Sequence, residues 1–151
     1  MPRWSDFERE APELAAKVRE RLDAHAHKTI ATLRRDGSPR ISGTESRIAG
    51  GDLLIGSMWG ALKARDLQRD GRFALHSGSD EPSEWRGDAK VAGVAVEVTD
   101  PAVADADPPE RAHTFRLDLH EASFVGLNDA RDRIVIEVWR PGEPVRRIER
   151  E

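Results

Sequence analysis

The chain has 151 residues, with 24 basic and 28 acidic side chains and a net charge of −4. This length suits one domain with a single core, and the negative charge gives no general attraction for nucleic acid or anionic lipid. The absence of cysteine excludes disulfides, thiolate metal sites and cysteine nucleophiles. No apolar run approaches the ~20 residues that span a bilayer, and the N-terminal stretch MPRWSDFERE lacks the apolar centre of a signal peptide. We therefore expect a cytoplasmic protein that binds neither nucleic acid nor membrane.

Residues 12–24, PELAAKVRERLDA, predict a helix. Pro12 suits a first helical position, because its missing N–H would have no partner there. Leu14, Val18 and Leu22 recur every four residues and form one apolar stripe. We expect an N-terminal helical segment over residues 1–27 that packs on the body of the same single domain, residues 28–151.

From residue 28 onward the apolar period changes to two, which is typical of strands. The predicted strands are 29–35, 40–48, 53–56, 72–77, 90–98, 114–119, 122–127 and 133–140, followed by a short final strand or tail. A helix is expected between the third and fourth of these, a polar loop over 78–85, and a breaker-rich connection over 99–110. Such regular hairpin spacing favours a small antiparallel barrel over a parallel sheet with crossover helices.

The segment SMWGALK, residues 57–63, joins the third predicted strand to the internal helix. Amides in the first turn of a helix have no internal partners, and the helix dipole is positive there. Ser57 offers a hydroxyl, Gly60 lets backbone approach a ligand, and Lys63 adds a mobile positive charge, so the segment predicts a phosphate cradle. The alternative is an ordinary helix start, with Ser57 as N-cap and Lys63 in water.

Two stretches, ATLRRDGSPRISGTE (31–45) and LLIGSMWGALKARDLQRDGRFAL (53–75), resemble the flavin-binding split-barrel family that includes pyridoxamine 5′-phosphate oxidase. The most specific element is the pattern K-A-x-x-L-x-x-D-x-R, formed by Lys63, Ala64, Leu67, Asp70 and Arg72. The resemblance implies a mainly β, α+β fold: a six-stranded antiparallel split barrel over residues 28–151, with a leading helix and one internal helix. It also implies a homodimer with two flavin sites at the subunit interface.

The same resemblance implies a bound cofactor, FMN or the deazaflavin F-420. It assigns Ser57 and Lys63 to the cofactor phosphate, and the second strand to the ribityl chain and the ring. Gly43 fits that role, because a strand residue without a side chain lets ring and backbone meet. Trp59 either flanks the cofactor or covers the dimer seam. The candidate cofactor-binding residues are Arg40, Ser42, Gly43, Glu45, Ser57, Trp59, Gly60 and Lys63.

The chain also departs from the oxidase. Leu62 stands where the oxidase has an arginine beside the phosphate lysine, and Glu45 stands where it has a lysine that grips the substrate phosphate. A carboxylate at that position repels a pyridoxamine phosphate dianion. The C-terminal substrate segment of the oxidase is not recognisable in VRRIERE. We therefore expect this fold without vitamin B6 oxidation.

The implied activity is hydride transfer between the cofactor ring and a small organic substrate. The redox chemistry belongs to the cofactor, while the protein anchors the phosphate, orients the ring and excludes water. No catalytic acid or base is assigned, although Glu45 and His76 are titratable residues expected near the ring. Two alternatives stay open: a flavin or deazaflavin carrier without turnover, and a dimeric domain that has lost its site.

Other sequence features give little support for a metal site or a hydrolase. His25 and His27 lack a carboxylate cluster at fixed spacing, so exposed residues at a helix exit are expected rather than a metal site. No G-x-S-x-G motif is present, so a hydrolase triad has no support. The basic stretch RPGEPVRR, residues 140–147, is either a solvated edge or a contact to an anionic cofactor tail.

Overall fold

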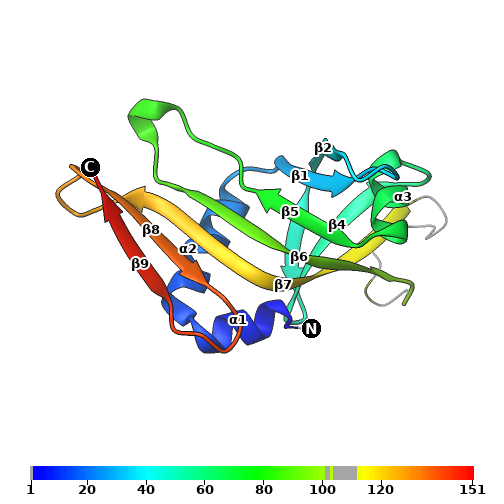
Figure 1. Ribbon diagram of the computed structural model, residues 1–151, viewed down its shortest axis with the longest axis horizontal. Helices are drawn as coiled ribbons and strands as arrows, with labels where there is room; N and C mark the ends of the chain where they lie inside the picture. The colour runs from blue at the N-terminus through cyan, green and yellow to red at the C-terminus, as the bar shows by residue number, and fades with distance from the viewer. Residues whose placement is uncertain (1, 101–102, 104–111) are drawn as a thin grey trace.

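The computed structural model describes residues 2–100, 103 and 112–151, which form one large antiparallel sheet with helices packed beside it (Figure 1). The helices are α1 (Trp4–Glu10), α2 (Pro12–Ala24), α3 (Leu62–Arg69) and a short 3-10 helix η1 (Pro82–Glu84). The strands are β1 (Lys28–Leu33), β2 (Pro39–Thr44), β3 (Ser46–Ala49), β4 (Asp52–Met58), β5 (Arg72–His76), β6 (Asp88–Val98), β7 (Ala112–Leu127), β8 (Ile134–Trp139) and β9 (Arg146–Arg150).

The order of the strands makes the sheet curl into a split barrel. Seven strands are hydrogen-bonded in the order β2-β1-β5-β6-β7-β4-β3. β2 and β3 lie at opposite ends of this path, although Glu45 is the single residue between them in the chain. Because one residue spans only ~3.5 Å, the two edges of the sheet must meet. In the described chain no ladder joins β2 to β3 or β4, so the barrel stays split between these edges.

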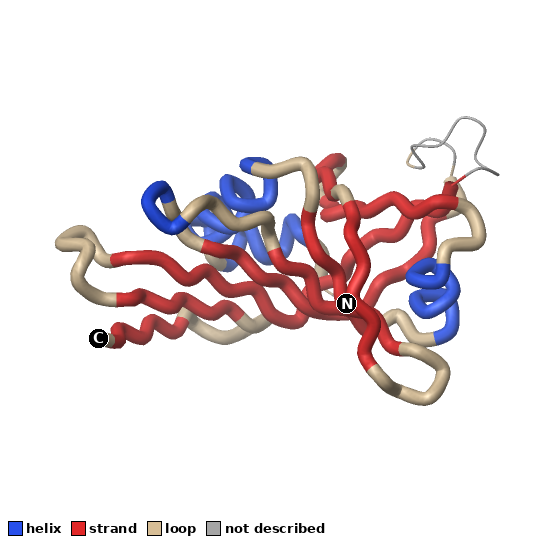
Figure 2. Tube along the Cα trace, turned by 90° about the horizontal axis from the view of Figure 1, so that it is seen from above, coloured by secondary structure: helices blue, strands red, loops and turns tan. Residues whose placement is uncertain are grey.

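The remaining strands extend the sheet into an arm, seen at the left of Figure 1. β7 is 16 residues long; its first half pairs with β4 and its second half with β8, which in turn pairs with β9. α1 and α2 cover one face of this arm (Figure 2). There the Phe7 ring lies 4.7 Å from the Trp139 ring, and Lys17 Nζ donates to Glu137 Oε1 at 2.6 Å.

The predicted helix over 12–24 is confirmed as α2, and Leu14, Val18 and Leu22 are buried in the hydrophobic core. The predicted strand over 133–140 has apolar residues on both faces. The structure shows that Val135 and Trp139 face inward. The same core contains residues from α1, α2 and α3 and from the sheet. Among the described residues, no helix combines the length and apolar character needed to cross a membrane.

The expectation of six strands is wrong, since the sheet has nine, and two helices rather than one precede it. The predicted strand over 40–48 breaks at Glu45, where the chain passes from one edge of the sheet to the other. The predicted strands over 114–119 and 122–127 are one strand, β7; the polar pair between them coincides with a register shift against β6 rather than a turn. Most of the predicted connection over 99–110 lies outside the described residues.

Candidate functional site

A cleft of about 700 Å³ lies at the split of the barrel. Its volume falls within the range of roughly 300–1,000 Å³ that is usual for cofactor and small-molecule sites. The end of β2, the start of β3 and the second half of β4 form most of its walls, and α3 contributes Lys63. Four predicted site residues line it: Gly43, Glu45, Ser57 and Lys63. The topology brings them together because β2 and β4 face each other across the split.

Lys63 lies in the first turn of α3 and reaches across the split. Its Nζ donates a hydrogen bond of 2.7 Å to the backbone oxygen of Gly43 on β2. Burial of the amine lowers the pKa of Lys63 below its ordinary value. A cation in the first turn is also opposed by the helix dipole. Within the described chain Lys63 has no ion-pair partner, so the charge at this wall of the cleft is uncompensated.

A second hollow, of about 410 Å³, adjoins the cleft, and Met58 and Lys63 line both. Arg40 and Ser42 belong to this hollow, not to the cleft. Arg40 Nε donates to Asp66 Oδ2 at 2.8 Å, and the Thr32 hydroxyl donates to the same oxygen at 2.8 Å. Arg40 therefore ties β2 to α3, because its guanidinium is already paired with a buried carboxylate.

The buried Asp66 carboxylate is the centre of this network. Burial raises its pKa, but hydrogen bonds from Arg40 and Thr32 and the charge of Arg40 outweigh that effect, so the pKa lies below its ordinary value. Arg69 Nη2 adds a third contact at 3.3 Å. α3, which carries Lys63, is thus fixed to β1 and β2 by one ionised side chain.

The turn between β4 and α3 differs from the predicted phosphate cradle. The Gly60 amide donates to Nε2 of His113 at 3.3 Å, and the Trp59 ring stacks on the His113 ring at 4.4 Å and 9°. Trp59 and Gly60 are not among the described residues that line the two hollows. The Gly60 amide, which was expected to face an anion, therefore donates to the His113 side chain instead.

The alternative in which Ser57 caps α3 is wrong, because the N-cap is Ala61. Ser57 is buried in the cleft wall, with its Oγ 3.4 Å from the Met58 oxygen. Sequence reasoning missed His113, which lies directly opposite Ser57 in the β4–β7 register. His113 could have been found from its pairing with Ser57, but that pairing is visible only once the register of β4 and β7 is known.

The motif residues at the end of α3 are paired with each other. Arg72 Nη2 donates to Asp70 Oδ2 at 2.7 Å, and hydrogen bonds from Arg72 lower the pKa of Asp70 to about 2. Among the other histidines, His25 Nε2 lies 2.8 Å from Asp80 Oδ1, and His76 Nδ1 lies 2.5 Å from the Ser77 oxygen. Within the described residues, no group of three or more histidine and carboxylate side chains is placed to hold a metal ion.

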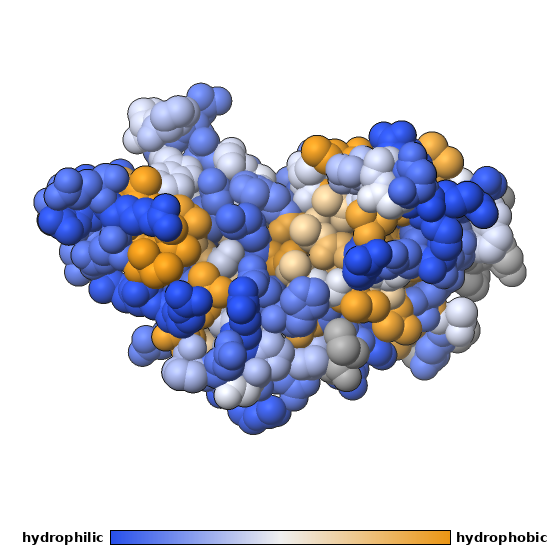
Figure 3. Space-filling view, in the orientation of Figure 1, coloured by the Kyte–Doolittle hydropathy of each residue, from blue (hydrophilic) through white to orange (hydrophobic). Residues whose placement is uncertain are grey.

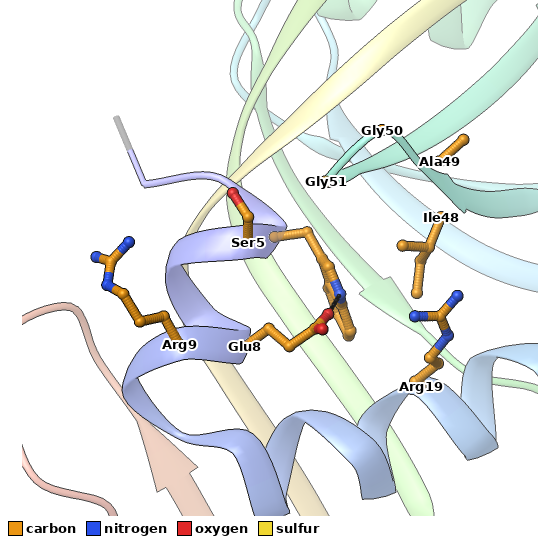
Figure 4. Close-up of a pocket in the computed structure, with 9 residues that line it drawn as sticks. Ser5, Glu8, Arg9, Arg19, Ile48, Ala49, Gly50 and Gly51 are labelled. Carbon is orange, nitrogen blue, oxygen red and sulfur yellow. Dashed lines mark hydrogen bonds between the residues drawn. The ribbon is translucent and has the colours of Figure 1, made fainter.

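A separate hollow of about 470 Å³ lies between α1, α2 and the β3–β4 turn (Figure 4). Its polar side chains are paired locally: Trp4 Nε1 donates to Glu8 Oε2 at 2.8 Å, and Arg9 Nη1 donates to Asp6 Oδ1 at 3.0 Å. None of the predicted site residues lines it. The cleft at the split is therefore the candidate site.

No protein-family model matches the sequence, and no curated protein matches it. Several solved structures share the fold. A heme binding protein from Mycobacterium smegmatis superposes with a TM-score of 0.65 at 19% identity, over 83% of this chain and 57% of that one. PhzG from Burkholderia lata 383, in complex with tetrahydrophenazine-1-carboxylic acid, gives 0.59 at 15% identity, over 90% and 85%.

A putative pyridoxamine 5′-phosphate oxidase from Listeria innocua gives a TM-score of 0.60 at 15% identity, over 71% of this chain and 94% of that one. These proteins differ in what their names say they bind, so their common feature is the architecture. The chain therefore has the split-barrel fold of the pyridoxamine 5′-phosphate oxidase-like proteins.

Proposed function

We propose that this protein is an oxidoreductase that binds a flavin or deazaflavin cofactor, FMN or F-420, and transfers a hydride between it and a small organic substrate. The observation that carries the proposal is Lys63, a half-buried cation without an ion-pair partner in the described chain, at the wall of the 700 Å³ cleft. An anionic cofactor tail supplies the missing counter-charge, and both the lysine and the positive end of α3 favour it.

The other walls of the cleft suit a flat ring. Leu54, Ile55 and Met58 give it an apolar side. A side chain at Gly43 would meet no atom of the described chain within 4 Å, so there is open space above the strand at this point. Lys63 and Ser57 would hold the anionic tail, while Gly43 and Glu45 would flank the ring. When bound, the cofactor supplies the hydride chemistry.

The residues of the chain anchor the cofactor, keep the cleft at a fixed width and select the substrate. Lys63 binds the anion, and Arg40 and Asp66 keep β2 and α3 at a fixed separation so that the cleft holds its width. The Glu45 carboxylate, 72% exposed, stands at the rim. It repels substrates that carry a phosphate of their own, so we infer an uncharged or weakly charged organic substrate.

We also propose a homodimer in which a second copy closes the cleft. Four large apolar side chains are exposed beside it: Ile41 (75%), Met58 (79%), Trp59 (62%) and Leu62 (57%). Monomeric soluble proteins rarely expose such a group without a partner. Of this apolar rim, Met58 lines the cleft, and Ile41, Met58 and Leu62 line the adjoining hollow. A second copy that covers the rim would place the cofactor sites at the interface.

The outer face of the barrel supports the same proposal. Ala31, Ala74 and Ala92 are direct partners across β1, β5 and β6, and they form a flat row of small side chains. Figure 3 shows apolar surface gathered over β5 and its neighbours near the centre of the molecule. A flat apolar face of this kind is suited to close packing against a second subunit.

The test is a binding titration of the purified protein with FMN, F-420 and haem, followed by reduction of the bound cofactor and addition of an electron acceptor. We expect FMN or F-420 to bind with one site per chain and Lys63→Ala to weaken it, while Arg146→Ala, at an exposed position on β9, leaves it unchanged. Binding without turnover would favour the carrier alternative. Preference for haem, or binding of none of the three, would overturn the proposal.

A further inference from the structure

His113 is a buried histidine that the proposed function does not use. It is 5% exposed, lies near the start of β7, and is the register partner of Ser57 on β4. Its ring contacts two segments that are distant in sequence: Glu97 on β6, and the Trp59–Gly60 turn that precedes α3. A single imidazole therefore joins the barrel wall to the segment that carries the candidate anion site.

The partners of the ring fix its protonation form. Nδ1 lies 2.7 Å from Glu97 Oε1, and a carboxylate accepts hydrogen bonds, so Nδ1 carries the proton. Nε2 lies 3.3 Å from the Gly60 amide, which can donate but cannot accept, so Nε2 presents a lone pair. The geometry thus requires the neutral Nδ1–H form of His113.

Glu97 is itself held in place by α3. Its Oε2 accepts a 2.8 Å hydrogen bond from Gln68 Nε2. Burial raises the pKa of Glu97, but the hydrogen bonds from Gln68 and His113 outweigh it, and the carboxyl is ionised at neutral pH. α3 is therefore connected to His113 at both ends, through Gly60 before its first turn and through Gln68 near its last.

We propose that His113 is a positioning residue: its neutral form holds the Trp59–Gly60 turn, and with it the first turn of α3, where Lys63 receives the anionic end of a ligand. The ligand part of this inference rests on the proposed function, whereas the turn-holding part does not. Protonation of Nε2 would set two N–H donors against each other, which breaks the bond to Gly60 and releases the turn.

Charged and uncharged groups surround the His113 ring and the turn that it contacts. Glu97 on β6 favours the protonated imidazole, because it is an anion 2.7 Å away. Arg65 on α3 lies beside the same turn, with its Nη2 3.9 Å from where a Cβ at Gly60 would stand. On β4 the register partner of His113 is the uncharged Ser57, and on β7 the Phe115 ring lies 6.2 Å from the His113 ring. The Trp59–Gly60 turn is therefore held through a ring nitrogen that accepts its hydrogen bond only while it carries no proton.

The first test needs no ligand. Long-range ¹H–¹⁵N spectra of the protein assign the His113 tautomer, and the Gly60 amide is followed from pH 8 to 5. We expect the Nδ1–H form at neutral pH, and a Gly60 shift that titrates together with the His113 ring. In His113→Gln, whose side-chain oxygen still accepts from Gly60 but does not titrate, the Gly60 shift should stay constant. An Nε2–H ring, or a Gly60 shift that moves equally in the variant, would overturn the inference.

The second test measures FMN affinity over the same pH range in the wild type, His113→Gln and His113→Phe. The FMN phosphate titrates equally in all three samples, so the difference between them isolates His113. Between pH 8 and pH 5, the FMN affinity of the wild type should fall about fivefold further than that of His113→Gln, which is the effect of one lost hydrogen bond. His113→Phe keeps the stacking on Trp59 but lacks the acceptor, so its affinity should be low throughout. Identical pH profiles would refute a role in ligand binding.

If no cofactor binds at all, the proposed function fails, while the spectra still decide whether His113 holds the turn.

Discussion

The amine of Lys63 and the backbone oxygen of Gly43 lie 2.7 Å apart, on the two sides of the split. This bond joins α3 to the edge strand β2 at the point where the barrel is open. A carbonyl oxygen is a partner for a cation but does not neutralise its charge. The contact therefore closes the wall of the cleft and leaves a positive group there for an anion.

Replacement of Lys63 by alanine should weaken binding of FMN or F-420 by roughly 1.5–3 kcal/mol, the size of a lost charge-assisted hydrogen bond. Thermal stability should change little, because a half-buried cation opposed by a helix dipole contributes little to the folded state. Isothermal titration gives the affinity and calorimetry the melting temperature. Equal affinities for the variant and the wild type would remove Lys63 from the binding site.

Two glycines in strands should respond differently to substitution by alanine. At Gly43 an added Cβ meets nothing within 4 Å, so Gly43→Ala should fold normally and lose ligand affinity by crowding the ring. At Gly93 the Cβ would lie 1.8 Å from the Asp118 backbone oxygen, so Gly93→Ala should lower the melting temperature sharply. Unfolding curves and titrations of both variants separate the roles. A large loss of stability in Gly43→Ala would show that this glycine is structural.

The exposed rim allows a test of assembly. Leu62→Glu places a charge on the apolar rim, and because it lies at the first position of α3 the new carboxylate also favours the helix dipole. We expect a dimer for the wild type and a monomer of unchanged helical content for the variant, by sedimentation and circular dichroism. Val145→Glu, at a 37% exposed apolar site away from the cleft, is the control and should stay dimeric. A monomeric wild type contradicts the proposed interface.

The buried carboxylate of Asp66 and the exposed carboxylate of Asp70 should contribute differently to stability. Asp66→Asn leaves Arg40 without its counter-charge, and should lower the free energy of unfolding at neutral pH by about 3 kcal/mol. Since the folded pKa of Asp66 lies below 3.8, its contribution is complete above that pH and is lost on acidification through the folded value. The two unfolding free energies should therefore converge in acid.

Asp70→Asn is the matched control for this substitution. Its pKa of about 2 reflects an exposed pair with Arg72, which solvent screens, so the loss of stability should be small at every pH. Urea unfolding across the pH range measures both effects. A stability loss for Asp70→Asn as large as that for Asp66→Asn would show that the exposed pair matters more than the buried network.

Local patterns in the sequence determined the individual elements. α2 begins at Pro12 and ends at Ala24 as predicted, because proline at a first helical position and the apolar stripe are both local signals. Ser57 and Lys63, which line the cleft, were named from the strand–helix junction, because that junction is continuous in the chain. Gly43 and Glu45 line it too, and were named from the family resemblance of the second strand.

Tertiary structure decided how these elements meet. The break at Glu45, the split in the barrel and the contact of Gly60 with His113 all depend on which strands pair and in which register. Alternation of apolar residues records which face of a strand is buried, but it carries no information about the neighbouring strand. His113 is therefore one polar residue among many in the sequence. It becomes a support of the candidate site only because β7 brings it beside a turn more than fifty residues away.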